Sequence, residues 1–135
     1  MPKVIQPKPK VIGIVGSRRR ATVEDQILLS AKFKEIYRVG DSVVSGGCPT
    51  GGDRFAEDIA RYYGLTITIH YPDWNNRKGE ITTDDLARKV AGFVRNTKIA
   101  EDCTILLALV AEDSSGGTED TVKKALKLKK KVILL

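Results

Sequence analysis

Three short loops rich in glycine and hydroxyl side chains are the parts of this 135-residue chain best suited to chemistry. They are Gly16-Ser17-Arg18, the stretch from Ser45-Gly46-Gly47 to Gly52-Asp53, and Ser115-Gly116-Gly117-Thr118. Each follows an apolar run and precedes a helical pattern, and helix N-termini offer free N–H groups and a positive dipole end to an anion. The loops therefore predict a site for the phosphate or carboxylate of a small molecule, although such glycine turns also occur for steric reasons alone.

The apolar pattern predicts five strands that alternate with helices. Short apolar or β-branched runs cover residues 11–15, 41–45, 66–69, 103–110 and 131–135. Between them, apolar residues recur three and four positions apart, as they do in amphipathic helices. This alternation is typical of a doubly wound α/β fold, so we expect a Rossmann-like, mainly parallel five-stranded sheet in a three-layer sandwich.

The domain organisation predicted from the sequence is simple. Residues 1–9 are rich in lysine and proline and are expected to form an N-terminal tail, and residues 10–135 a single domain. In an open α/β sheet, ligands bind beyond the carboxyl ends of the strands, where the strand order reverses. All three loops fall at such ends, and their convergence on one edge favours a ligand over a purely steric role.

Several functional classes are not expected from the sequence. Neither the P-loop pattern Gly-x-x-x-x-Gly-Lys-Ser/Thr nor the full dinucleotide pattern Gly-x-Gly-x-x-Gly occurs, which disfavours P-loop hydrolysis and an ordinary dehydrogenase. The longest apolar stretch, residues 105–111, is far shorter than the roughly 20 residues that span a bilayer. Cys48, His70 and Cys103 lack the spacing of metal ligands. We therefore expect a cytoplasmic protein with no membrane contact, no metal and no resident cofactor.

Further candidate residues lie outside the first and third loops. Arg95 and Asn96 interrupt the apolar face of a helix predicted over residues 84–100, so at least one should point at the pocket, because a buried arginine needs an anion. A structural ion pair with Asp84, Asp85 or Glu101 is the alternative for Arg95. Trp74 either stacks on a base or anchors its loop on the core. Asp53 either faces the pocket or caps the second helix.

The motifs, taken in order, resemble those of the SLOG superfamily, which joins the DNA-processing Smf/DprA proteins to the LOG nucleoside-monophosphate phosphoribohydrolases. The matching segments are Gly13–Arg18, Val44–Gly47 with Gly52–Glu57, Tyr71–Trp74, Ala91–Asn96 and Gly116–Thr118. The Pro-x-x-Trp segment followed by Ala-Gly-x-x-Arg-Asn is similar to the YspA-like branch. The resemblance covers residues 10–135.

The resemblance implies a Rossmann-like pocket for a nucleotide or a nucleotide-derived ligand, and a homodimer. The loops and the resemblance together give thirteen candidate ligand-binding residues. They are Gly16, Ser17, Arg18, Ser45, Gly46, Gly47, Asp53, Trp74, Arg95, Asn96, Gly116, Gly117 and Thr118.

Three functions remain open, and the first is binding or sensing of a nucleotide-like small molecule. The second is phosphoribohydrolase-like cleavage of an N-glycosidic bond, with Asp120 or Glu119 as the catalytic candidate. LOG enzymes carry Pro-Gly-Gly-x-Gly-Thr-x-Glu, whereas residues 114–120 lack the proline and align Asp120 with the catalytic glutamate. The third is single-stranded nucleic-acid binding through the DprA-like second loop and the lysines of residues 123–131, which few aromatic side chains accompany.

Overall fold

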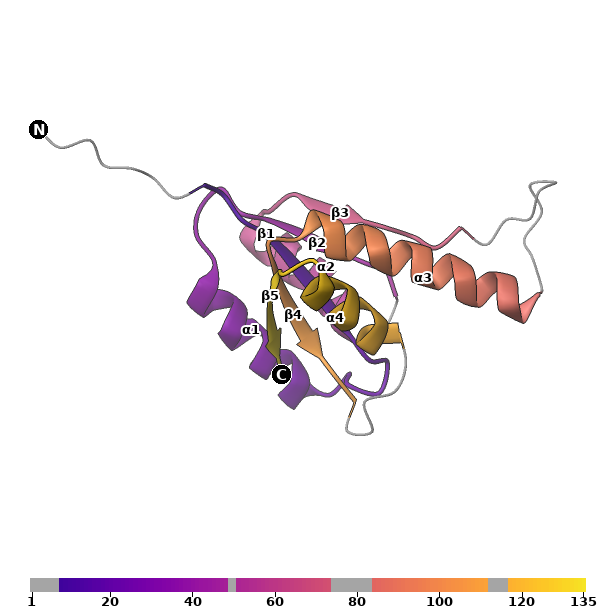
Figure 1. Cartoon of the computed structure of the whole chain (residues 1–135). Coiled ribbons are helices and arrows are strands. Elements are labelled where there is room, and N and C mark those ends of the chain that lie inside the picture. Colours follow the sequence, from indigo (N-terminus) through magenta and orange to yellow (C-terminus); the bar gives the residue numbers. More distant parts are fainter. Residues whose placement is uncertain (1–7, 49–50, 74–83, 112–116) are drawn as a thin grey trace, which may run out of the picture.

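A five-stranded sheet forms the middle layer of the protein (Figure 1). The computed structural model describes residues 8–48, 51–73, 84–111 and 117–135. The strands are β1 (Val11–Gly16), β2 (Ser42–Ser45), β3 (Ile67–Ile69), β4 (Ile105–Leu109) and β5 (Lys131–Leu134). The helices are α1 (Val23–Ile36), α2 (Gly52–Tyr63), α3 (Asp85–Asp102) and α4 (Gly117–Lys127).

The strand order is β3-β2-β1-β4-β5, and every pair of neighbours is parallel. At the centre, Ile12 of β1 pairs with Val43 of β2 on one side and with Ile105 of β4 on the other. This order is that of a Rossmann-like sheet, with the reversal between β1 and β4. The predicted α/β class and three-layer architecture are confirmed, and the sheet is entirely rather than mainly parallel.

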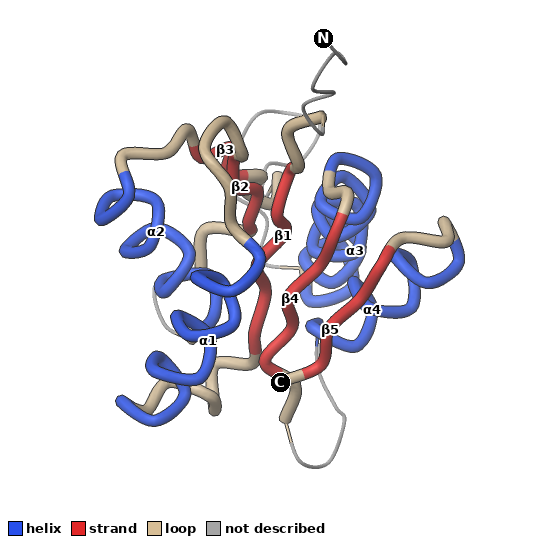
Figure 2. Tube along the Cα trace, turned by 90° about the vertical axis from the view of Figure 1, so that its left-hand side faces the viewer, coloured by secondary structure: helices blue, strands red, loops and turns tan. Residues whose placement is uncertain are grey.

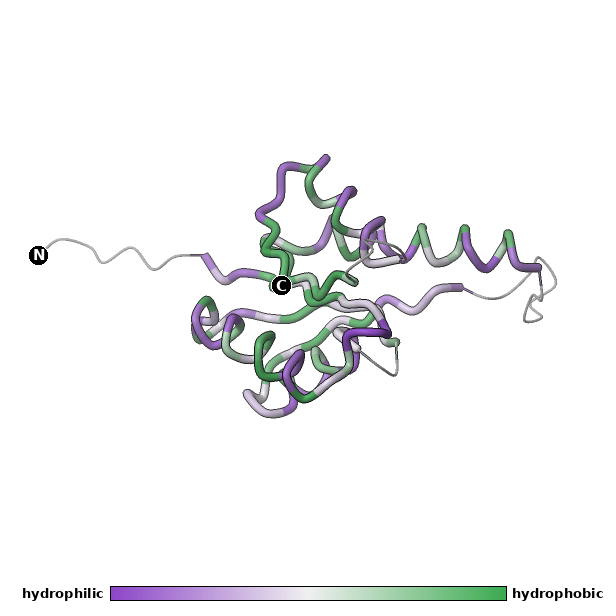
Figure 3. Tube along the Cα trace, turned by 90° about the horizontal axis from the view of Figure 1, so that it is seen from below, coloured by the Kyte–Doolittle hydropathy of each residue, from purple (hydrophilic) through white to green (hydrophobic). Residues whose placement is uncertain are grey.

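Two helices cover each face of the sheet (Figure 2). On one face, Leu29 and Phe33 of α1 and Phe55 and Ile59 of α2 pack on the sheet. On the other, α3 and α4 contribute a smaller set of buried apolar side chains. Every residue of β4 is buried, as expected of a parallel strand covered on both faces. The apolar residues accordingly gather in the middle layer (Figure 3).

The first half of α3 departs from the sequence-based expectation, because its apolar residues do not face the interior. Leu86, Val90 and Val94 are 69%, 50% and 52% exposed, and the buried residues of this helix begin at Asn96. Eighteen helical residues span about 27 Å, whereas the five residues of β4 span about 17 Å. The helix therefore extends past the edge of the sheet (Figures 1 and 3). None of the described helices is long and apolar enough to cross a membrane.

The first two glycine loops are joined by a direct backbone contact. A Cβ atom on Gly52, at the start of α2, would lie 2.6 Å from the amide nitrogen of Gly16, at the end of β1. A Cβ on Gly16 would lie 2.9 Å from the Cα of Gly52. Because the obstructing atoms are backbone, neither position has room for a side chain, and the two glycines fix the distance between the loops.

A pair of glycine substitutions tests this contact. Gly52→Ala should lower the free energy of unfolding by about 1–3 kcal/mol, because the added methyl group forces the two backbones apart. Gly92 lies in the middle of α3 with no atom within 4 Å of its Cβ position, so Gly92→Ala should raise it by about 0.5–1 kcal/mol. Chemical denaturation of both variants measures the two effects. A Gly52→Ala protein as stable as the wild type would show that the loops are not held by this approach.

Candidate functional site

A cavity of about 360 Å³ opens at the carboxyl edge of the sheet, where β1 and the starts of α2 and α4 meet α3. Its volume falls in the range of about 300–1,000 Å³ that is usual for small-molecule sites. The cavity lies at the reversal in strand order, the position that the sheet topology predicts for a ligand. Its lining residues are Val15, Gly16, Ser17, Arg18, Arg19, Cys48, Asp53, Arg95, Asn96, Ile99, Gly117, Thr118 and Thr121.

Eight of the thirteen sequence candidates line this cavity. They are Gly16, Ser17, Arg18, Asp53, Arg95, Asn96, Gly117 and Thr118. Sequence reasoning missed three polar lining residues. Thr121 lies one helical turn after Thr118. Arg19 follows Arg18 in a run of three arginines at residues 18–20, and Cys48 lies inside the second glycine loop. Each of these positions could have been found by extending a motif along its own element.

The remaining candidates lie elsewhere. Ser45 and Gly46 are buried, and Gly47 is half-buried against the ring of Tyr71; none of the three lines the cavity. Trp74 and Gly116 lie outside the described residues. The two catalytic candidates line a neighbouring groove of about 580 Å³ between α3 and α4 rather than the cavity. These are Glu119 and Asp120.

Arg95 of α3 is held in place by two hydrogen bonds. Its Nη1 donates to the carbonyl oxygen of Gly46 at 2.5 Å, and its Nε donates to Oδ1 of Asn96 at 2.9 Å. A Cβ on Gly46 would lie 2.6 Å from that Nη1, so the absence of a side chain at Gly46 makes room for the guanidinium. Of the ion-pair partners considered above, Asp84 and Asp85 lie about 15 Å or more up the helix and Glu101 about 9 Å down it. The contacts of Arg95 are therefore with the cavity wall.

Asn96 connects α3 to α4. Its side chain is buried, and Nδ2 donates to the carbonyl oxygen of Gly117 and to Oδ2 of Asp120, both at 3.2 Å. Asp120 also accepts a hydrogen bond from Lys124 at 2.8 Å. The amide oxygen and nitrogen of Asn96 are both used, so this residue aligns Arg95 with the N-terminus of α4.

Asp53 is a buried carboxylate at the base of the cavity. Oδ1 accepts a hydrogen bond from Oγ of Ser45 at 3.2 Å, and Oδ2 accepts one from the backbone N–H of Cys48 at 3.1 Å. Burial raises the pKa of this carboxyl, while the Cys48 N–H, the charge of Arg95 and the Ser45 hydroxyl pull it downward. The N-cap interpretation of Asp53 is wrong, because Gly51 occupies the N-cap of α2.

The helix N-termini converge on the cavity less completely than the loops suggest. The starts of α2 and α4 border it, but the start of α1 does not. In α1 the side chain of Thr22 accepts from the backbone N–H of Asp25, whose carboxylate accepts in return from the N–H of Thr22. The first loop instead contributes Arg18 and Arg19, which are exposed on the cavity wall.

The charge of the lining favours an anion. Three guanidinium groups, from Arg18, Arg19 and Arg95, face one carboxylate, that of Asp53. Within the described ranges, no group of three or more His, Cys, Asp or Glu side chains could hold a metal ion. His70 lies outside the cavity lining, where it pairs with Asp102 at 2.5 Å.

Comparisons with known proteins identify the fold but not a family. No protein-family model matches the chain, and no curated protein matches it. A molybdenum cofactor binding protein from Rippkaea orientalis has a TM-score of 0.63 and 21% identity, and the match covers 96% of this chain and 77% of that one. The molybdenum cofactor carrier protein of Chlamydomonas reinhardtii gives 0.62 and 23%, with 94% and 76% covered. A second structure of that carrier gives 0.59 and 27%, with 95% and 76% covered. This chain shares their fold.

The raised pKa of Asp53 predicts a specific dependence of stability on pH. A carboxyl whose pKa is higher in the folded than in the unfolded protein destabilises the fold as pH rises from the unfolded value near 3.8 through the folded value. Asp53→Asn removes that charge at every pH. The free energy of unfolding of Asp53→Asn minus that of the wild type should therefore increase over this interval and then level off, as measured by denaturation at a series of pH values.

Asp58→Asn is the matched control. Asp58 lies on the same helix, at the surface, where it pairs with Arg54 and Arg61. An increase shared by both variants would reflect net charge rather than Asp53. A difference for Asp53→Asn that shrinks with rising pH would mean that its folded pKa is lowered.

Proposed function

We propose that this protein binds or senses a nucleotide or a nucleotide-derived small molecule, with the phosphate in the cavity at the carboxyl edge of the sheet. The observation that carries the proposal is the presence of Arg18, Arg19 and Arg95 around one cavity that also borders the starts of α2 and α4. Arginine binds phosphate through paired N–H donors in a planar fork, and helix N-termini add further donors.

The hydrogen-bond donors of Arg95 support this role. Nε and one Nη1 hydrogen are bonded to Asn96 and Gly46, and these bonds fix the plane of the guanidinium. Its other three N–H donors make no hydrogen bond to the described part of the chain and are proposed to bind the ligand. An arginine that is already oriented loses little conformational entropy when an anion arrives.

The comparisons suggest which molecules to test. The fold neighbours are named as proteins that carry or bind the molybdenum cofactor, so that cofactor is a candidate ligand beside the nucleotides. The motifs that resemble the SLOG superfamily and its YspA-like branch favour a nucleotide and a homodimer. We take AMP as the first probe, and light scattering as the measurement of the oligomeric state.

N-glycosidic cleavage of such a ligand is a weaker proposal. Asp120, the candidate for stabilising developing positive charge, lines the neighbouring groove and is paired with Asn96 and Lys124. The groove adjoins the cavity through Arg95, Asn96 and Gly117, but the contacts with Asn96 and Lys124 already engage this carboxylate. The buried carboxylate beside Arg95 is Asp53, which already accepts two hydrogen bonds.

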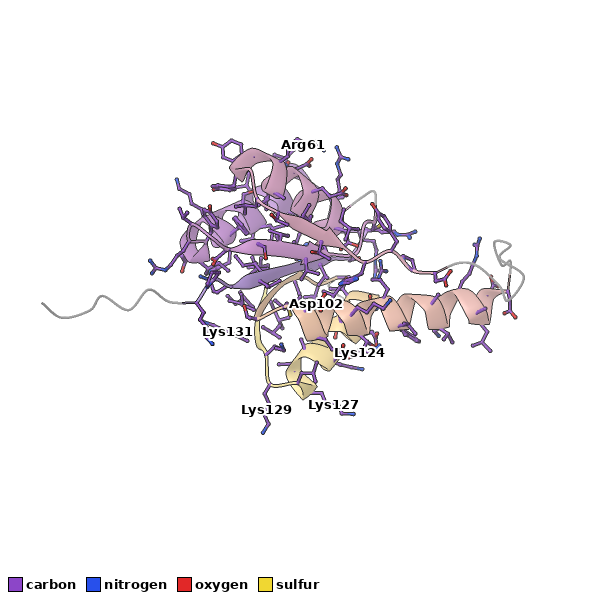
Figure 4. All side chains as sticks on the ribbon, turned by 90° about the horizontal axis from the view of Figure 1, so that it is seen from above. Arg61, Asp102, Lys124, Lys127, Lys129 and Lys131 are labelled. Atoms are coloured by element: carbon purple, nitrogen blue, oxygen red, sulfur yellow. The ribbon has the colours of Figure 1, made fainter. Side chains whose placement is uncertain are left out.

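Nucleic-acid binding is supported less well, because the lysines lie away from the cavity. Lys127 ends α4, about 14 Å along this helix from Thr118, and Lys129 lies just beyond it; both project away from the helix (Figure 4). Lys124 is engaged with Asp120, and Lys130 donates to the carbonyl oxygen of Glu101. Contacts made by these lysines alone would give weak, strongly salt-dependent binding of single strands.

Removal of the Arg95 side chain should separate ligand binding from stability. Charge-assisted hydrogen bonds contribute roughly 1.5–3 kcal/mol, so Arg95→Ala should weaken AMP binding about ten- to a hundredfold. Arg95→Lys should restore only part of the affinity, because an ammonium group lacks the planar fork. Calorimetric titration with AMP and thermal melting without ligand measure the two effects.

Arg61→Ala is the control for this experiment. Arg61 lies on the outer surface of α2 (Figure 4), and its side chain is 73% exposed. Its loss should leave AMP affinity unchanged. If Arg95→Ala lowered the melting temperature while affinity per folded molecule stayed the same, Arg95 would be a structural residue and the site would be wrongly assigned.

A further inference from the structure

Tyr71 lies against Gly47, the residue next to Cys48 of the cavity lining, and it is largely uncovered. It comes two residues after the end of β3, and the residue is 65% exposed. The ring lies on Gly47: a Cβ there would come within 2.5 Å of Cε1 and 2.8 Å of Cδ1. Gly47 has a φ of +72°, so this loop position combines a backbone that favours glycine with an aromatic ring on its surface.

The loop that carries the ring is also the loop that holds the arginine. Gly46 accepts the hydrogen bond from Arg95, Gly47 supports Tyr71, and Cys48 lines the cavity. Gly46 and Gly47 are adjacent, with Cα atoms about 3.8 Å apart, so the loop contacts the guanidinium at one residue and the ring at the next. One short loop thus sets a cation and a flat apolar surface next to each other.

The ring of Tyr71 is not part of the aromatic cluster of this protein. The ring pairs of the described residues join Phe33, Tyr37, Tyr62 and Tyr63 at the C-terminal ends of α1 and α2. Tyr71 lies instead at the edge of the sheet, with one edge of its ring on Gly47. A planar group that stacks on an aromatic ring of this kind gains contact area with little loss of side-chain freedom.

We propose that Tyr71 determines ligand specificity, by stacking on the planar heteroaromatic ring of a ligand whose phosphate is bound at Arg95. The inference rests on the proposed function and adds the chemical class of the second half of the ligand. A phosphorylated molecule with a flat ring is preferred over one that carries the same phosphate and sugar alone.

Two probes separate the ring from the phosphate: AMP, and ribose 5-phosphate, which lacks the base. Their affinities are measured by calorimetry for the wild type, Tyr71→Ala and Tyr71→Phe. Tyr71→Ala should weaken AMP about tenfold and change ribose 5-phosphate by less than about twofold, whereas Tyr71→Phe should keep the affinity for AMP. Tyr62→Ala, which removes an 83% exposed ring from α2, is the control and should change neither.

The outcomes distinguish this inference from the proposed function. Wild-type protein that binds neither probe at the cavity overturns both. Wild-type protein that binds AMP and ribose 5-phosphate equally well, or Tyr71→Ala with unchanged AMP affinity, overturns the role of Tyr71 and leaves the phosphate site standing. Equal losses for the two probes in Tyr71→Ala would mean that the ring supports the Gly46–Cys48 loop and does not stack on the ligand. Thermal melts of each variant establish that it is folded.

Discussion

The hydrogen bonds of Arg95 and Asn96 are the interactions on which the candidate site depends. The two residues are neighbours on α3, but their side chains bond to different elements. Arg95 donates to the carbonyl oxygen of Gly46 in the loop after β2, and Asn96 donates to that of Gly117 at the start of α4. Two adjacent side chains thereby tie a helix on one face of the sheet to two separate loops at its carboxyl edge. These bonds fix the positions of α3, the loop after β2 and the start of α4 relative to one another.

This arrangement keeps positive charge available at low energetic cost. A buried cation without a partner is strongly destabilising, but Arg95 is only partly buried and faces Asp53 as well as a carbonyl oxygen. The carboxylate of Asp53 offsets part of this charge, and the lining carries more guanidinium groups than carboxylates. The raised pKa of Asp53 reflects its burial beneath this cluster.

Local patterns were sufficient to predict the fold, because β4 is uniformly apolar and each of the first four strands is followed by a helix. The described residues of the three glycine loops also lie at one edge of the sheet, as predicted. The role of Asn96 in tying α3 to α4, and the displacement of Asp120 into the adjoining groove, depend on how those helices pack together, which periodicity does not encode. Val90 is exposed, although the apolar pattern of its helix places it on the inner face. The pattern shows which face of a helix is apolar, but it does not show where the sheet beneath the helix ends.

The crystal structure of the protein with AMP bound is the most direct test of the central claim, that the cavity bordered by Arg95 is an anion site. The account predicts that the phosphate lies against the guanidinium of Arg95 and the first turn of α4, with Gly16 and Ser17 on the opposite side. An AMP molecule bound only in the groove lined by Glu119 and Asp120, or only at the lysines beyond α4, would contradict it.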